Sequence, residues 1–260
     1  MKFEVLNADG SGRARLFVFQ NYGRSYALQP IWPDPARKDA SAEDWVALYR
    51  QALERLRADG MAEAGTRVSD IPEFAAFRER LPELGFRRRH VRVEYRAELE
   101  KLPTDEGSPF TWESMAPAGP WDEARVVELL RKVGRGDPDF DVENEDVLEV
   151  LRGYFNDPEL TNDPAHAQVG RLEGKSIAFV FAQVAPKSGW SRITYMGLAP
   201  EWRGRGLGKW VHRRGFELMR RQGGKLYHGG TLEQNAGMRA LFLSHGCAEF
   251  RRLEEWVCAL

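Results

Sequence analysis

The chain has 260 residues, and its 38 lysines and arginines nearly balance its 39 aspartates and glutamates, giving a formal net charge of −1 at pH 7. This length is sufficient for one large domain or two modest ones with hydrophobic cores. The charge balance provides no general basic surface, so we expect no nucleic-acid partner. The two cysteines, Cys247 and Cys258, lack the spacing of a zinc site. They indicate neither a metal nor a disulfide framework, and they fit a reducing compartment.

No apolar run approaches the roughly 20 residues that a membrane-spanning helix needs. The N-terminal residues also lack the apolar core of a signal peptide. We therefore expect a cytoplasmic protein without a membrane partner. No feature of the sequence indicates an oligomeric state.

The N-terminal part of the chain alternates predicted strands and helices. In order, these are strands at 3–6, 13–20 and 22–29, a helix ending near residue 58, a helix at 72–84 and one or two strands at 86–99. Residues 9–12 predict a turn between the first two strands. Asp39 or Ser41 is expected to cap the first helix, and Gly85 is expected to end the second.

Residues 101–109 are polar and interrupted by prolines, which predicts a linker. We therefore divide the chain into a domain at 1–104 and a domain at 105–260. The expected elements of the second domain are a strand at 110–115, a helix from 122, a helix at 146–155, a hairpin at 165–171 and 175–184, a strand at 192–198, a helix from about 207, a strand at 225–231, a helix at 235–245 and a final strand at 250–260.

A glycine-rich turn connects the strand at 192–198 to the next helix, and Pro200 ends that strand because it has no N–H to donate. The turn contains three glycines and three basic residues, namely Gly204, Gly206, Gly208, Arg203, Arg205 and Lys209. The first amides of a helix lack internal partners, and the helix dipole attracts negative charge to them. Without glycine side chains in the way, a pyrophosphate can bind the backbone while the basic residues add charge. A flexible surface loop is the alternative interpretation.

The spacing Arg203-x-x-Gly206-x-Gly208, after a strand that ends in x-x-Pro, resembles the coenzyme A loop of the GCN5-related N-acetyltransferases (GNAT). The dinucleotide fingerprint G-x-G-x-x-G is not met, because the residue after Gly208 is Lys. The short motif alone is weak evidence, but its position between a predicted strand and a predicted helix strengthens the resemblance.

Residues 231–247 resemble the next strand and helix of the same family, in which Asn235 opens the helix and Gly246 ends it. The resemblance implies an α/β fold with a mixed sheet, acetyl-CoA as co-substrate and no metal. It also implies that the backbone N–H of Leu198 donates to the oxyanion of the reaction. The implied coenzyme A-binding residues are Leu198, Arg203, Gly204, Arg205, Gly206, Leu207, Gly208, Lys209 and Asn235.

The N-terminal third echoes the second half of the chain. Residues 56–60 resemble residues 219–223, and Gly85 corresponds to Gly246 at an offset of 161. We interpret residues 1–104 as a degenerate copy, as in tandem members of the family. The loop at 30–39 contains no glycine and carries acidic side chains, which would repel phosphate. The alternative is that helix–glycine–strand segments resemble one another in general.

The catalytic residues are less clearly marked. Many family members place a tyrosine at the position of Phe242, and many carry a carboxylate on the strand before the loop, where residues 191–199 contain no Asp or Glu. His228 and Glu233 are candidate bases, because a histidine titrates near neutrality and a desolvated glutamate has a raised pKa. For both, a surface or packed polar side chain is the alternative.

An acidic run at 137–146 lies between the first two helices of the second domain. The resemblance places this region at the acceptor entrance, where it would attract a cationic amine. The alternative is an exposed loop whose carboxylates favour the start of the following helix.

The sequence thus predicts an enzyme that transfers an acetyl group from acetyl-CoA to the amine of a small molecule by direct attack. A catalytically silent acyl-CoA-binding module is the alternative, favoured by Phe242 and by the strand without an acid. A transferase dependent on aminoacyl-tRNA is less favoured, since the chain has no evident RNA-binding surface.

Overall fold

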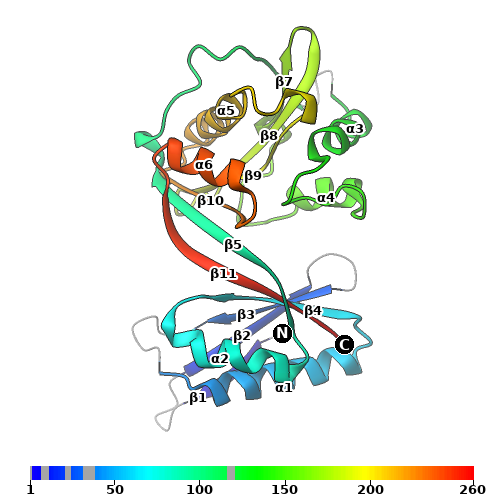
Figure 1. Cartoon of the computed structure of the whole chain (residues 1–260), viewed down its shortest axis with the longest axis vertical. Helices are drawn as coiled ribbons and strands as arrows, with labels where there is room; N and C mark the ends of the chain where they lie inside the picture. Colours follow the sequence, from blue (N-terminus) through cyan, green and yellow to red (C-terminus); the bar gives the residue numbers. More distant parts are fainter. Residues whose placement is uncertain (1, 7–11, 21–24, 32–38, 116–120) are drawn as a thin grey trace. The chain divides into compact units, whose positions relative to one another are not determined.

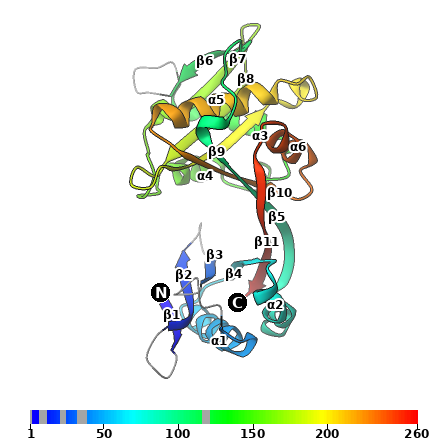
Figure 2. The same ribbon diagram turned by 90° about the vertical axis from the view of Figure 1, so that its left-hand side faces the viewer.

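The computed structural model describes residues 2–6, 12–20, 25–31, 39–115 and 121–260. Most of the predicted turn at 9–12 and most of the loop at 30–39 lie outside these residues. The chain forms two compact units, one of residues 1–93 with 251–260 and the other of residues 94–250 (Figures 1 and 2). Within the described ranges, no helix combines the length and apolar character that a membrane crossing requires.

The first unit is a sheet covered on one face by helices (Figure 1). Its elements are β1 (Lys2–Leu6), β2 (Gly12–Gln20), β3 (Ser25–Ile31), α1 (Ala42–Ala58), β4 (Glu63–Ser69), η1 (Pro72–Phe74), α2 (Ala75–Arg80), η2 (Leu81–Leu84) and the first part of β5 (Arg87–Glu98). Of the two predicted candidates, Ser41 and not Asp39 caps α1: its side chain accepts from the Asp44 N–H, and the Asp44 carboxylate accepts from the Ser41 N–H in return.

Aromatic side chains form the core between α1 and α2. The Trp45 and Phe74 rings lie 5.5 Å apart, and those of Tyr49 and Phe77 lie 4.9 Å apart. The Tyr49 hydroxyl is buried but paired, since it lies 2.6 Å from the hydroxyl of Thr66 on β4. Hydrophobic burial therefore stabilises this unit without leaving the tyrosine oxygen unsatisfied.

The second unit contains the helices and strands expected from the sequence, together with short 3-10 helices that were not predicted. These are η3 (Leu99–Lys101), β6 (Thr111–Ser114), α3 (Glu123–Gly134), α4 (Val147–Tyr154), η4 (Pro164–His166), β7 (Ala167–Leu172), β8 (Lys175–Val184), β9 (Trp190–Leu198), η5 (Pro200–Trp202), α5 (Gly208–Arg221), β10 (Leu226–Leu232) and α6 (Ala236–Ser244). Its strands follow the order β5-β10-β9-β8-β7-β6. β9 and β10 run parallel whereas β6 to β9 run antiparallel, so the predicted α/β fold with a mixed sheet is confirmed.

Helices α3 and α5 pack on opposite faces of β9. A Cβ atom on Gly215 of α5 would lie 2.3 Å from Ile193 Cδ1, and one on Gly197 of β9 would lie 2.8 Å from Val133 Cγ2 of α3. Glycine at both positions allows this close approach, because any larger side chain would push the helix away from the strand.

The last strand, β11 (Ala248–Ala259), differs from its predicted place. Its residues Leu253–Ala259 pair antiparallel with Ser69–Glu63 of β4, so residues 251–260 belong to the first unit. The division predicted at 104/105 also differs, because the structure divides β5 at Val93/Glu94. The pattern of a strand predicts its existence but does not identify its partner.

The predicted linker at 101–109 is bound to the second unit. Arg220 of α5 donates to the carbonyl oxygens of Leu99 and Leu102, and Arg214 forms a 2.9 Å ion pair with Asp105. A polar sequence with prolines therefore marks an irregular segment here rather than a free connection.

The predicted internal repeat has structural support at its glycines. Gly85 and Gly246, which precede β5 and β11, have φ values of +86° and +82°, and Gly60 and Gly223 have values of +72° and +79°. Both members of each pair thus occupy the left-handed region that favours glycine at the end of a helix. The assignment of the first unit as a degenerate copy remains a proposal.

We predict that Cys258→Asp destabilises the first unit rather than the second. Cys258 is 2 % exposed and lies in the core of the first unit, so the variant buries an unpaired carboxyl group and costs about 3 kcal/mol. Limited proteolysis with mass spectrometry should show cleavage within residues 1–93 first. Ala259→Asp, at an exposed position of the same strand, is the matched control. First cleavage within 105–250 would contradict the pairing of β11 with β4.

Candidate active site

Strands β9 and β10 pair only where they begin. Trp190 pairs with Leu226 and Ser191 with Tyr227, but β9 continues unpaired with β10 to Leu198. Along β9, consecutive residues direct their N–H groups to opposite edges. The Ala199 N–H donates to Ile177 O on the β8 side, so the Leu198 N–H is directed to the edge from which β10 has separated. This orientation supports the predicted oxyanion donor.

A β-bulge in β9 accompanies the separation. Phe181 of β8 pairs with Tyr195 and Ala182 with Ile193, which leaves Thr194 as an extra residue. A bulge bends its strand and increases the local twist. The bulge therefore bends the second half of β9 away from β10.

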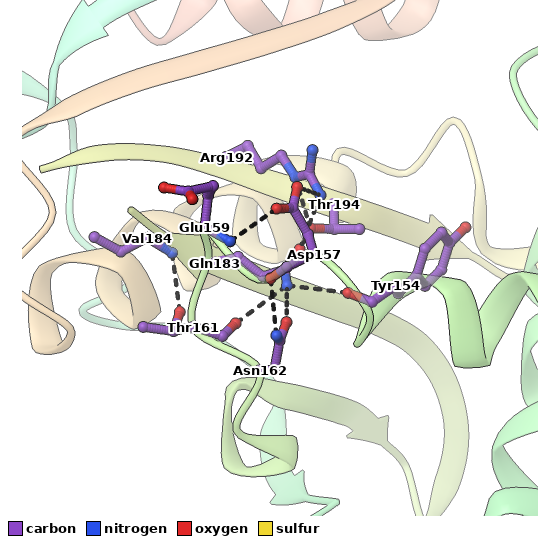
Figure 3. A network of polar contacts seen from close by, with 9 residues as sticks. All are labelled: Tyr154, Asp157, Glu159, Thr161, Asn162, Gln183, Val184, Arg192 and Thr194. Atoms are coloured by element: carbon purple, nitrogen blue, oxygen red, sulfur yellow. Dashed lines mark hydrogen bonds and ion pairs between the residues drawn. The ribbon is translucent and has the colours of Figure 1, made fainter. Parts of the chain in front are cut away.

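The side chain of Gln183 on β8 holds the bulge in place (Figure 3). Its oxygen accepts from the Thr194 hydroxyl at 2.5 Å and from Arg192 Nη2 at 3.2 Å. Its nitrogen donates to the carbonyl oxygens of Tyr154 and Thr161 and to Asn162 Oδ1, at 2.9–3.1 Å. Gln183 is fully buried, and the network uses both ends of its amide, as a buried polar group requires.

The backbone of the glycine turn is accessible, because no other atoms lie close to two of its glycines. Gly204 and Gly206 both have φ of +73°, and nothing lies within 4 Å of the position of a Cβ atom on either. Leu207, the residue before α5, provides no side-chain cap, and the first turn of α5 contains no acidic residue. The first amides of α5 are therefore suited to an anion.

Two basic residues of the turn lie against tryptophans. The Arg205 guanidinium lies 5.0 Å from the Trp202 ring centre, and Lys209 Nζ lies 5.2 Å from that of Trp210. These contacts position both cations beside the turn.

The Arg203 side chain contacts three backbone carbonyl groups. Its Nε donates to Leu198 O, its Nη1 to Gly136 O and its Nη2 to Val133 O, at 2.8–3.3 Å. Every guanidinium nitrogen is thus used to connect the end of α3 to the end of β9. Its side chain therefore stabilises the fold of the site, and its predicted contact with coenzyme A stays a prediction.

The Asn235 side chain is also occupied within the protein. Its Oδ1 accepts from the Met238 N–H at 3.1 Å and caps α6, while its Nδ2 donates to Asp139 Oδ2 at 2.8 Å. Asp139 accepts in addition from the Leu232 N–H and the Thr231 hydroxyl. Asn235 therefore has a structural role at the end of β10, and its predicted contact with coenzyme A stays a prediction.

Asp146 at the end of the acidic run at 137–146 caps α4, because its Oδ1 accepts from the N–H groups of Leu148 and Glu149. The exposed-loop interpretation therefore holds for this end of the run, and the attraction of a cationic amine stays a prediction. The beginning of the run turns inward. Asp139 is directed to β10, and Asp137 Oδ2 accepts from the hydroxyl of Tyr195 on β9 at 3.2 Å. Burial is the largest effect on Asp137, and it raises the pKa of this carboxyl. Asp141 and Glu143 are solvent-exposed.

The two predicted bases lie in different surroundings. The His228 ring lies between the rings of Trp190 and Phe250, with centres 5.7 and 5.2 Å away. Glu233 is exposed on the turn after β10, where its carbonyl oxygen accepts from Arg239. Both stay predictions.

Among the residues with described positions, no group of three or more acidic, His or Cys side chains is arranged to hold a metal.

Phe242 is packed in an aromatic cluster on the side of α5 and α6. It is 1 % exposed and stacks on Tyr95 with ring centres 4.4 Å apart. Next to it, His212 Nδ1 lies 2.9 Å from His245 Nδ1, and its Nε2 lies 2.9 Å from the Tyr227 hydroxyl. Burial lowers the pKa of both histidines, that of His245 to about 4, so both are neutral at pH 7.

Sequence reasoning missed Gln183 and the inward direction of Asp137. The first had a signal, since Gln183 is a polar residue within the otherwise apolar end of the strand at 177–184. The second had none, because a run of acidic residues in a loop does not show which of them turns inward.

Comparisons with known proteins support the fold and the motif. Residues 128–247 match the model of the acetyltransferase (GNAT) family. A GCN5-related N-acetyltransferase from Sphaerobacter thermophilus is similar in structure, with a TM-score of 0.71, 16% identity, and coverage of 99% of this chain and 80% of that one. A search of curated proteins found no matching sequence.

Two further solved structures are similar to nearly the whole chain. A tandem GNAT protein from the clavulanic acid biosynthesis pathway gives a TM-score of 0.63 at 14% identity, with 97% of this chain and 81% of that chain covered. A GCN5-related N-acetyltransferase from Kribbella flavida gives 0.60 at 14% identity, with coverage of 99% and 89%. At these identities the likeness shows the fold. The sequence match places the similarity to the acetyltransferase (GNAT) family at residues 128–247.

Proposed function

We propose that this protein transfers an acetyl group from acetyl-CoA to the amine of a small molecule by direct attack. The observation that carries the proposal is the separated edge of β9, toward which the Leu198 N–H is directed, beside the open glycine turn at the start of α5. An extended thioester can align with such an edge while its pyrophosphate binds the turn.

The backbone of residues 204–209 would hold the pyrophosphate. The helix dipole and the unpartnered first amides of α5 favour negative charge at this end. Arg205 and Lys209, positioned by their contacts with Trp202 and Trp210, add positive charge. Arg203 would contribute indirectly, because it fixes the end of β9 relative to α3.

The Leu198 N–H would stabilise the negative charge on the carbonyl oxygen as the tetrahedral intermediate forms. Loss of one such donor typically costs about a hundred- to a thousand-fold in rate. The acceptor amine attacks only in its neutral form, so a group on the acceptor side must take its proton.

A silent acyl-CoA-binding module is the second candidate, and the burial of Phe242 favours it. No phenol stands at this position to protonate the departing thiolate. General acid catalysis is typically worth about a hundred- to ten-thousand-fold. A thiol with a pKa of about 8.5 nevertheless leaves readily as the thiolate, so we favour slow but real transfer. Screening a panel of primary amines for acetylation above the uncatalysed rate decides between the two candidates.

We predict that Gly206→Val weakens acetyl-CoA binding by more than about tenfold, because a side chain would enter the anion cradle. Stability should fall by only about 1–2 kcal/mol, the cost of the left-handed backbone, since nothing lies within 4 Å of the added Cβ atom. Isothermal calorimetry and thermal unfolding measure the two effects. Gly223→Val is the matched control: Gly223 has φ of +79° and equal space, but follows the far end of α5. Equal affinity of both variants would contradict the assigned turn.

We also predict that each chain binds one acetyl-CoA. The loop at 30–39, which corresponds to the glycine turn in the proposed repeat, has no glycine and contains acidic residues, so its side chains would oppose a phosphate. Calorimetric titration should give a stoichiometry near one. A value near two would show that the first unit also carries a binding site.

A further inference from the structure

We propose that Asp137 is the base that accepts the proton of the acceptor amine and that Tyr195 positions its carboxylate. The inference rests on the proposed acetyltransferase function, and it assigns the proton transfer to residues outside the two candidates from the sequence. It is supported by the position of the loop between α3 and α4, whose side chains contact both of the separated strands, β9 and β10.

The loop contacts both strands through two carboxylates. Asp137 accepts from Tyr195 on β9, and Asp139 accepts from the backbone of Leu232 on β10. Phe140, 5 % exposed, packs edge-on against the Tyr195 ring at 5.2 Å and anchors the loop. The loop thus brings acidic side chains to the region where β9 and β10 have parted.

Of the two carboxylates, Asp137 is the one that can act as the base for the amine. Asp139 accepts from three donors that hold β10 and the start of α6, namely Thr231, Leu232 and Asn235. Protonation of Asp139 would weaken all three contacts. Asp137 accepts one bond on each oxygen, from the Asp139 N–H at 3.0 Å and from the Tyr195 hydroxyl at 3.2 Å. An ionised carboxylate has lone pairs for about four such bonds, so Asp137 retains capacity for an amine or a water molecule.

Tyr195 fixes the position of Asp137 relative to Leu198. Tyr195 follows the bulged residue Thr194 directly, and its hydroxyl lies 3.0 Å from the position of a Cβ atom on Gly197. The hydroxyl, and the carboxylate that it contacts, therefore lie beside the last residues of β9. Tyr195 is 9 % exposed and also stacks with Tyr154 of α4, with ring centres 6.2 Å apart, which restricts its motion.

The electrostatic surroundings make Asp137 a stronger base than an exposed aspartate. Burial is the main cause of its raised pKa, and the neighbouring carboxylate of Asp139 raises it further. The Asp139 N–H, the Tyr195 hydroxyl and the Arg203 guanidinium act in the opposite direction. A base that still ionises but has a higher pKa takes a proton more effectively.

The step is balanced in protons and electrons. The nitrogen lone pair of the amine forms the C–N bond to the thioester carbonyl carbon, and Asp137 accepts one proton from that nitrogen. The C–S bond then breaks, and its electron pair leaves with the sulfur as the thiolate. Asp137 returns its proton to solvent, and the thiolate takes one from solvent, so the net products are the amide and free thiol.

The test compares Asp137→Asn with Asp141→Asn, an exposed carboxylate of the same loop. The acceptors are ethanolamine, tyramine and spermidine, and hydroxylamine serves as a second nucleophile. Hydroxylamine is a far weaker base than an alkylamine and is largely neutral near pH 7, so it does not depend on a base in the same way. Acetyl-CoA binding to each variant is measured by calorimetry.

We expect Asp137→Asn to lower kcat for the alkylamines by about a hundred- to ten-thousand-fold, the usual value of a general base. Its activity with hydroxylamine should fall far less, its affinity for acetyl-CoA should be unchanged, and Asp141→Asn should retain the kcat of the wild type. Equal losses with both nucleophiles, loss of acetyl-CoA binding, or no loss at all would overturn the assignment of Asp137. If the wild type acetylates neither nucleophile while acetyl-CoA binds, the proposed function fails as well.

Tyr195→Phe tests the positioning role through the pH–rate profile. The Tyr195 hydroxyl lowers the pKa of Asp137, so its removal should raise that pKa. Because Asp137 must be ionised to act, the acidic limb of the profile should move to higher pH. An unchanged acidic limb would show that Tyr195 does not position the base.

Discussion

The separation of β9 from β10 is the constraint on which the site depends. Parallel neighbours usually remain paired along their length, because a backbone N–H or C=O that loses its partner costs free energy unless another group replaces it. Here pairing ends after Ser191 and Tyr227, while both strands continue. In the proposed function, the thioester of acetyl-CoA takes the place of the missing strand partner along this backbone edge. The bulge at Thr194 bends β9 locally and so accompanies the separation.

Gln183 makes this arrangement specific. A buried amide contributes little net stability, but each of its partners would be left unsatisfied if it were removed, at about 1–3 kcal/mol per group. Gln183 connects the bulge to the segment after α4 (Figure 3), through its bonds to Thr194 and to the carbonyl oxygens of Tyr154 and Thr161. Slippage of β9 by one residue would break these contacts together. The network therefore selects one register of β9, which a purely apolar strand would not do.

Local patterns in the sequence predicted local structure well. The glycine turn, the Ser41 cap and the order of strands and helices in the second unit follow from steric preferences over a few residues. The partner of β11 did not follow, since β5 and β11 alternate in similar ways and pairing depends on distant contacts. Arg203 and Asn235 were placed correctly along the chain, but their side chains turn toward protein groups. A motif fixes the backbone of such residues more firmly than the direction of their polar atoms.

The two sides of the site differ in the chemistry that they can support. On the side of α6, Phe242, Tyr95 and the neutral pair His212 and His245 form an aromatic cluster in which burial disfavours charge. On the side of α3, Asp137 remains a half-buried carboxylate with a polar partner. This asymmetry matches the two proton transfers. An alkylamine with a reference pKa of about 10.4 is almost entirely protonated at pH 7, whereas a thiol with a pKa of about 8.5 gives a thiolate that departs without help. Removing a proton from the nitrogen is therefore the harder task, and the side of the site that contacts β9 through Tyr195 is the one equipped for it.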